Sequence, residues 1–189
     1  VMYAVTGDEI KVVRELLETL KRNFEGKEYT RRLESRVRDQ GYIELGIPGG
    51  TTTLMAAMMT ASTEVVSMLL EGGANVHSVD VMGNDALIFA ASMGRPKNLQ
   101  CWLERVKDWD LNRQNTIIGS FAVSVGVYQG AKKIHTVKAL VSAGALLDYR
   151  TFSGSSALTN AVDNEDSDPD VVRFLLETCL LYTSPSPRD

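Results

Sequence analysis

Three motifs within residues 50–77 decide the fold: Gly50-Thr-Thr-Thr-Leu-Met-Ala-Ala-Met58, Val65-Val66-Ser-Met-Leu-Leu70 and Gly73-Ala74-Asn75-Val76. In the second motif the apolar residues Val66, Leu69 and Leu70 recur at the spacing of one helix face. The glycine that opens the third motif is typical of the residue at which a helix ends. The stretch therefore predicts two short helices joined by a tight turn.

The same pattern recurs along the chain. Copies of the first motif begin at glycines spaced by 33, 36 and 35 residues, and they are 50–58, 83–91, 119–127 and 154–162. A second apolar helix pattern follows each copy, at 65–70, 98–103, 136–141 and 171–176. Such a period indicates a repeat array, in which helix pairs must stack because none can bury its apolar face alone.

These motifs resemble the ankyrin-repeat family, whose pattern runs Gly-x-Thr-Pro-Leu-His-x-Ala-Ala, a short loop, Val-Val-x-x-Leu-Leu and Gly-Ala-Asp/Asn-Val. Residues 50–77 follow this pattern without a gap, although Thr53 replaces the family proline and Met55 the histidine. The third unit departs most, since Val123 and Gly126 replace leucine and alanine, so its stability has the least support from the sequence. The resemblance implies an all-α ankyrin-repeat solenoid of stacked helix-turn-helix units with short hairpin-like loops.

Local signals predict where the helices begin and end. Pro96 and Pro169 stand where a second helix should begin, and Asp168 can cap the helix that starts at Pro169. Gly73 and Gly144 stand where the backbone should leave a helix through a left-handed conformation.

The repeats divide the chain into segments. We predict a partial N-terminal ankyrin-like unit at 1–26, an irregular insertion at 27–47, four repeats at 48–80, 81–115, 116–150 and 151–178 with the last truncated, and a non-native tail at 179–189. Tyr29, Leu33 and Val37 recur every four residues, which indicates that part of the insertion is helical.

The two ends have features of their own. The chain opens on Val1, so we expect its true start to be missing. Residues 179–189 resemble a translated sequencing adapter, so we expect native sequence, and the last helix with it, to stop near Thr178. A natural Ser/Pro tail is the alternative.

Composition limits the class of protein. The 189 residues are 44% hydrophobic and 23% charged with a net charge of −4, which favours a soluble chain without a general attraction to nucleic acid. The longest weakly polar run, 117–128, is far short of the ~20 residues that a membrane span needs. Charged residues follow the first few apolar residues at once, which argues against a signal peptide. Two cysteines make no disulfide framework, so we expect an intracellular, cytoplasmic protein.

No set of residues has catalytic or metal-binding spacing. Residues 46–53 resemble a phosphate-binding loop, but no lysine follows the glycines. His77 and His135 lie in different repeats, and the acidic run at 163–170 lacks the glycine and the closing glutamate of a calcium loop. We therefore expect no enzymatic activity, no cofactor and no metal, and we interpret the acidic run as a solvated loop.

Two further features have structural interpretations. Residues 27–39 contain five basic and three acidic side chains with a single aromatic one, a pattern more typical of a solvated helix face than of a nucleic-acid site. Cys101 stands beside Trp102 in a helix pattern, and we expect a buried structural thiol without a nearby basic group to lower its pKa.

The resemblance implies that a partner binds at the hairpin tips and at the concave face of the first helices. The predicted partner-binding residues are Val81, Met82, Asn84, Ile117, Ile118, Phe152 and Ser153 at the tips, with Met59, Met93, Tyr128 and Gln129 behind them. Many are large and apolar where exposed tips should be polar, and a continuous apolar strip is typical of a binding site. The alternative is that some tips fold down onto neighbouring repeats, or onto repeats that are missing.

We therefore predict a protein–protein interaction module that serves as a scaffold or adaptor. One alternative is the targeting region of a larger enzyme, such as a kinase or ubiquitin ligase, whose catalytic domain lies outside these residues. A second alternative, binding of nucleic acid through residues 31–38, would require affinity that depends strongly on salt.

Overall fold

The computed structural model describes residues 1–37, 47–128, 133–166 and 168–183, and these residues form stacked helices without a β-strand. The helices are α1 (Met2–Thr6), α2 (Ile10–Asn23), α3 (Gly26–Leu33), α4 (Thr53–Thr60), α5 (Thr63–Glu71), α6 (Ala86–Ser92), α7 (Pro96–Arg105), α8 (Ala122–Gly126), α9 (Lys133–Ser142), α10 (Ala157–Asp163) and α11 (Pro169–Thr183). This arrangement confirms the predicted all-α solenoid.

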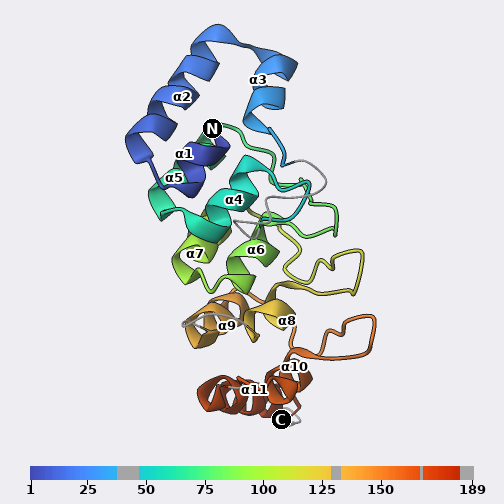
Figure 1. Cartoon of the computed structure of the whole chain (residues 1–189). Coiled ribbons are helices and arrows are strands. Elements are labelled where there is room, and N and C mark those ends of the chain that lie inside the picture. Colours follow the sequence, from blue (N-terminus) through green and yellow to red (C-terminus); the bar gives the residue numbers. More distant parts are fainter. Residues whose placement is uncertain (38–46, 129–132, 167, 184–189) are drawn as a thin grey trace.

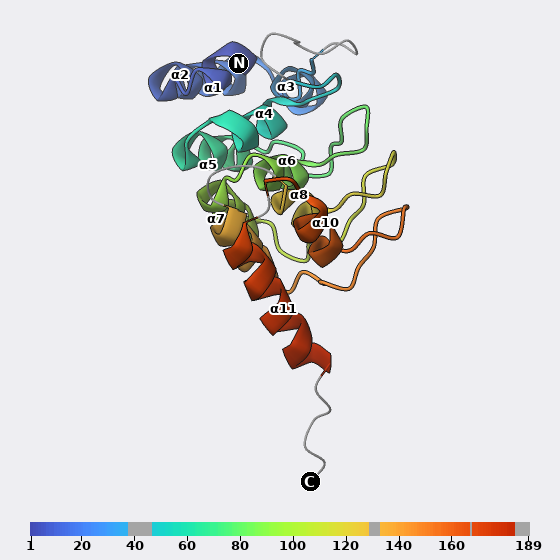
Figure 2. The same ribbon diagram turned by 60° about the horizontal axis from the view of Figure 1, so that its bottom comes forward.

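The helices form two columns. The first column contains α1, α4, α6, α8 and α10 in contact with one another in that order, and the second contains α2, α5, α7, α9 and α11. Each first helix also packs against the second helix that follows it, and the loops between pairs project to one side (Figures 1 and 2). We call the pairs α1/α2, α4/α5, α6/α7, α8/α9 and α10/α11 layers 1 to 5. The additional helix α3 packs against α2.

Side chains at equivalent positions of successive layers form the core. Leu54, Leu87 and Val123 fill the space between layers and are each at most 1% exposed. Small residues allow the first helices to approach closely: a Cβ added at Gly126 would lie 3.9 Å from the Cβ of Ala91 in the preceding layer. Close packing of this kind, repeated along the stack, stabilises each layer through its neighbours.

The predicted helix boundaries are confirmed. The helices α7 and α11 begin at Pro96 and Pro169, and the carboxylate of Asp168 accepts a hydrogen bond from the backbone N–H of Asp170 at 3.0 Å. Gly73 and Gly144 have φ angles of 84° and 99°, the left-handed conformation expected after a helix.

The divergent third unit has the short helix α8, of five residues. Its N-cap position holds Phe121, whose side chain makes no capping hydrogen bond because it has no polar atom. The hydroxyl of Ser124 instead accepts from the Phe121 N–H and donates to the Phe121 carbonyl, at 2.9 and 2.8 Å. Ser124 thus bonds both backbone groups of the N-cap residue, which is the reciprocal half of a capping box, while the N–H groups of the first turn receive no side-chain cap from Phe121.

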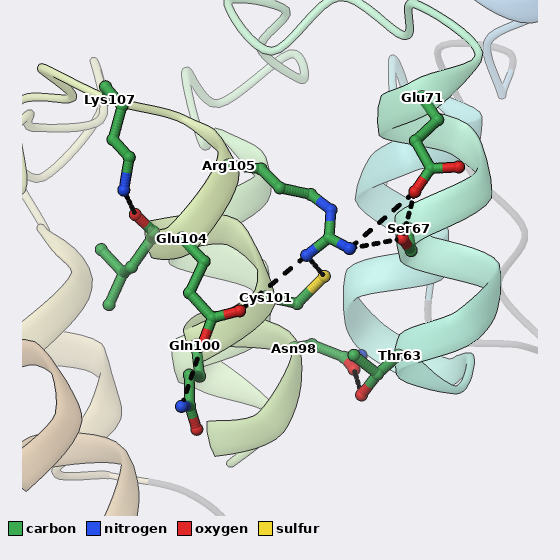
Figure 3. Close-up of polar contacts among 10 residues, drawn as sticks. Thr63, Ser67, Glu71, Asn98, Gln100, Cys101, Glu104, Arg105 and Lys107 are labelled. Carbon is green, nitrogen blue, oxygen red and sulfur yellow. Dashed lines mark hydrogen bonds and ion pairs between the residues drawn. The ribbon is translucent and has the colours of Figure 1, made fainter.

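Polar side chains connect one layer to the next. Arg95, at the start of α7, donates to the carbonyl oxygens of Thr60 and Ala61 at the end of α4, at 3.0 and 2.6 Å. On the outer side, Arg105 of α7 donates to the Ser67 hydroxyl of α5 at 2.8 Å (Figure 3). The two Arg95 contacts satisfy carbonyls that a helix end leaves without intrahelical partners.

Two expectations about the less regular parts can be compared with the structure. The helix α3 confirms that part of the insertion is helical, with Leu33 buried and the Tyr29 hydroxyl donating to the Gly72 carbonyl at 2.6 Å. The expected end of the last helix near Thr178 is wrong, because α11 continues to Thr183. Its helical pattern extends without a proline or glycine through residue 183, which lets the helix continue.

None of the helices in the described ranges combines the length and the apolar character that crossing a bilayer requires.

Candidate partner-binding site

The hairpins at residues 80–84, 115–120 and 151–155 project from the same side of the stack, each ahead of a first helix (Figure 2). In each hairpin a backbone N–H donates, at 2.8–3.0 Å, to the carbonyl of the residue that follows the tip glycine; the pairs are Asp80–Asn84, Asn115–Ser120 and Thr151–Ser155, and Val37 pairs with Thr51 in the same way ahead of α4. All four tip glycines have positive φ angles, between 70° and 85°. The repeat thus builds one conserved geometry at each loop.

Backbone hydrogen bonds also join each tip to the next. The N–H of Val81 donates to Gly49 at 3.2 Å, that of Thr116 to Met82 at 3.0 Å and that of Phe152 to Ile118 at 3.0 Å. Because these bonds run from loop to loop, the tips form a continuous edge along the stack.

Five of the predicted contact residues stand exposed on this edge. We call Val81, Met82, Ile117, Ile118 and Phe152 the tip row; their exposed fractions are 53%, 37%, 56%, 55% and 64%. The alternative that these tips fold down onto neighbouring repeats is not what the structure shows. Even Phe152, whose ring lies against the backbone of Gly119, keeps most of its surface open.

Buried polar side chains hold the tip row in place. The Asp80 carboxylate accepts from the N–H groups of Met82 and Asn84 at 2.8 and 2.7 Å. The Asn115 amide oxygen accepts from Ile118 and Ser120 at 3.2 and 3.1 Å. The Asn115 amide also donates to the Asn84 oxygen at 2.9 Å, which links two hairpins. The exposed apolar side chains therefore stand on a hydrogen-bonded support, which fixes their positions.

The other predicted tip residues have supporting contacts. Asn84 is half-buried and uses its side chain within the Asp80–Asn115 network. Ser153 is exposed, with its hydroxyl 3.0 Å from that of Thr151.

The predicted residues behind the tips lie elsewhere. Met59 is 5% exposed in α4, so its prediction as a surface contact is wrong: the side chain belongs to the core between layers. Met93 and Tyr128 are exposed, but they follow the C-terminal ends of α6 and α8, so the length of a first helix separates each from its tip. Met93 instead lines a pocket of about 450 Å³ at the start of α7. Gln129 lies outside the described residues.

Val37, which lies within the predicted insertion, pairs with Gly50 and Thr51 through backbone hydrogen bonds. Residues 38–46 of the insertion lie outside the described residues, so its predicted bounds of 27–47 stay a prediction. The Gly50 N–H, part of the phosphate-like sequence, donates to the Val37 carbonyl at 3.0 Å, so the hairpin uses it.

The remaining candidate groups are engaged within the chain. Arg36 donates to the carbonyls of Gly50 and Val79 at 2.8 and 2.6 Å, and the Arg32 guanidinium lies 4.0 Å from the centre of the Phe24 ring. His77 stacks on Trp109 with ring centres 5.3 Å apart. Within the described ranges no three His, Cys, Asp or Glu side chains gather in a way that could hold a metal ion.

Cys101 is buried, as predicted, but it has a basic neighbour. The Arg105 guanidinium lies 3.3 Å from the thiol sulfur on the same face of α7 (Figure 3). Burial nevertheless dominates and raises the pKa of the Cys101 thiol, while Arg105 acts in the opposite direction. The thiol is therefore less reactive than a free cysteine, despite the positive charge beside it.

Asp85, at the base of the second hairpin, combines a structural role with a buried charge. Its carboxylate caps α6 by accepting from the Ile88 N–H at 2.8 Å, and the residue is 1% exposed. Burial raises the pKa of this carboxyl above its ordinary value of 3.8, against hydrogen bonds from Ile88 and Leu87 and the charge of Arg113. The folded state therefore holds the proton more tightly than the unfolded chain does.

This shift predicts how stability depends on pH. The contribution of Asp85 to the free energy of unfolding is fully present below about pH 3.8. It decreases as pH rises through the folded-state pKa, because the folded chain must then ionise a buried carboxyl group. Asp85→Asn keeps an oxygen that can accept from Ile88, so its stability relative to wild type should rise with pH over that window. Asp85→Ala should show the same trend, offset by a loss of about 1 kcal/mol for the missing cap. Urea unfolding of the three proteins between pH 4 and 7 measures both effects. If the free energies of unfolding of wild type and Asp85→Asn changed with pH in parallel, the raised pKa of Asp85 would be contradicted.

The comparisons with known proteins agree with this geometry. A family model described as ankyrin repeats (3 copies) matches residues 1–115, and the stacking of helix pairs continues beyond them through α11. The chain is 34% identical over 116 residues to the nuclear factor NF-kappa-B p105 subunit of Gallus gallus, which is 61% of this chain and 12% of that protein. It is 31% identical over 106 residues to the ankyrin repeat and SAM domain-containing protein 6 of Rattus norvegicus, 56% of this chain and again 12% of the relative. The family model covers more than half of the sequence, and this chain belongs to the ankyrin-repeat family.

Proposed function

We propose that this chain is a scaffold or adaptor module that binds another protein through the tip row. Ankyrin repeats are in general protein–protein interaction modules. The observation that carries the proposal is the row of exposed Val81, Met82, Ile117, Ile118 and Phe152 side chains, joined across layers by backbone hydrogen bonds. The buried Cys101 thiol, which forms no disulfide, also fits a reducing, intracellular environment for this binding.

The chemistry of the tip row favours an apolar partner segment. Its five side chains carry no charge, and the nearby polar groups of Asp80 and Asn115 are already bonded to the hairpin backbone. Contact with this edge therefore gains free energy mainly from burial of apolar surface, at roughly 25 cal/mol per Å². Since the support is already ordered, little conformational entropy is lost when the partner binds.

Replacing Ile118 and Phe152 together with serine should weaken partner binding by at least about 2 kcal/mol, roughly thirtyfold, because both are large exposed side chains on one edge. The measurement is capture of proteins by the immobilised chain, followed by titration of each captured protein. Helical content by circular dichroism should stay that of wild type, since neither side chain belongs to the core.

Val12→Ser is the matched control, because Val12 is also large and exposed, at 45%, but lies on α2 away from the hairpins. We expect at least one protein that wild type and Val12→Ser retain and that the double variant loses. Equal retention of every captured protein by all three forms would refute the assignment of the tip row.

A further inference from the structure

The tip row has a regular spacing along the stack. Two hydrogen-bonded pairings separate equivalent positions of successive tips: one within a hairpin, Asp80 with Asn84, and one between hairpins, Thr116 with Met82. Backbones paired in this way lie about 4.8 Å apart, so successive tips stand roughly 10 Å apart. Packed helices stand about 8–10 Å apart, which agrees with this spacing of the layers.

The tip row is also wider than one side chain. Val81 and Met82 are exposed together at one tip and Ile117 and Ile118 at the next, whereas Phe152 is the exposed apolar side chain of the last tip. A segment that follows the row must therefore offer apolar side chains about every 10 Å. At the first two of these tips it must offer a face that is broad enough to cover a pair.

An α-helix meets both requirements. Its side chains return to the same face every seven residues, about 10.5 Å along the axis, and a stripe at i, i+3 or i+4 and i+7 places two apolar side chains in each such step. A β-strand fits less well, because side chains on one of its faces recur about every 6.6 Å. A polyproline helix has a suitable repeat of about 9.3 Å, but it places only one side chain on a given face in each turn.

Positive charges stand beside the tips at both ends of the row. The Arg36 guanidinium donates to the Gly50 carbonyl at 2.8 Å, and the Arg150 guanidinium donates to the Gly154 carbonyl at 2.7 Å. Both side chains are exposed, and neither forms a salt bridge with a carboxylate within the described residues. A partner that carries carboxylates beside its apolar side chains would therefore be complementary in charge.

We propose that the tip row is the docking site for an acidic amphipathic α-helix of the partner. The helix lies along the stack, with its apolar stripe against the five side chains of the row and its carboxylates near Arg36 and Arg150. Three steps separate Gly50 from Gly154, so about 20 residues of helix, some 30 Å long, reach both arginines. The inference rests on the proposed function, because it names the class of segment that the same surface binds.

Synthetic peptides of about 21 residues test the inference. The helix probe has leucine at i, i+3, i+7, i+10, i+14 and i+17 among glutamate and glutamine. The alternating probe has the same composition with leucine at every second position, and the lysine probe has lysine in place of each glutamate. Fluorescence anisotropy with the full chain should show the helix probe binding about tenfold or more tightly than either of the others. Since a helix of this length is marginal in water, its helicity should rise on binding, which circular dichroism measures.

Variants of the chain locate the binding. Ile118→Ser combined with Phe152→Ser should weaken the helix probe about tenfold or more, whereas Val12→Ser should leave its affinity unchanged. Arg150→Gln tests the charge alone, because Gln114 donates in the same way, at 2.8 Å, to the tip glycine of the preceding hairpin. Arg150→Gln should weaken the helix probe about two- to fivefold at low ionic strength, and the difference should disappear at high salt.

Failure of the helix probe to bind, binding without a gain of helicity, or tighter binding of the alternating probe would overturn the helical partner. Equal affinity of the glutamate and lysine probes would overturn its acidic character. Failure of this inference can be told from failure of the proposed function. A captured protein that the double serine variant loses, but that the helix probe does not displace from wild type, counts against the inference alone. Capture that is the same with and without Ile118 and Phe152 counts against the proposed function as well.

Discussion

Replacing Trp102 with alanine should lower the free energy of unfolding by about 3–5 kcal/mol, the range found when a large buried aromatic side chain is removed. Trp102 is fully buried in α7, at the middle of the stack, and packs edge-on against Trp109 with ring centres 5.2 Å apart. Its loss leaves a cavity in layer 3, which supports the layers on both sides. Urea unfolding followed by circular dichroism measures the change.

Trp102→Phe separates packing from hydrogen bonding. The Trp102 indole N–H has no hydrogen-bond partner among the described atoms, so phenylalanine removes ring volume without breaking a bond. We therefore expect Trp102→Phe to cost less than half as much as alanine. Val12→Ala, at an exposed site, should change the free energy of unfolding by no more than about 0.5 kcal/mol. A loss below about 1 kcal/mol for Trp102→Ala would show that layer 3 does not hold the stack together.

The sequence could predict the stack because its determinants are local and repeated. The period of the glycines, the prolines at positions 96 and 169 and the glycines at 73 and 144 each act within one or two turns of backbone. Repetition then fixes the arrangement in space, since each layer can bury its apolar face only against a similar one. The exposed tip row follows from the same register, because the tip residues have fixed offsets from the glycines.

The errors concern contacts that depend on distant residues. The position of Met59 in the repeat pattern predicts a side chain that points outward. Its burial depends instead on how closely α4 and its neighbouring helices approach. The pairing of Val37 with Gly50 across twelve residues has no local turn signal, so the sequence did not predict these hydrogen bonds. The contact between Arg105 and Cys101 is different: residues four apart share a helix face, so the sequence did contain that signal.

The close contact between successive hairpin tips leads to a second prediction, at Gly83. Gly83→Ala should lower the free energy of unfolding by about 2–4 kcal/mol, through left-handed backbone strain and a lost hydrogen bond between tips. Gly83 has a φ angle of 81°, and an added Cβ would lie 2.7 Å from the backbone nitrogen of Thr116. That nitrogen donates to Met82, so the two hairpins must separate to make room.

Gly154→Ala is the matched control for this substitution. Gly154 has nearly the same φ angle, 85°, but an added Cβ would meet nothing within 4 Å. It should therefore show the strain alone, about 1–2 kcal/mol. Urea unfolding of the two variants measures the difference, which is the free energy of close contact between successive tips. The same contact fixes the position of Met82 in the tip row, so Gly83→Ala should also weaken partner binding. Equal losses of stability in Gly83→Ala and Gly154→Ala would mean that the tips are not coupled.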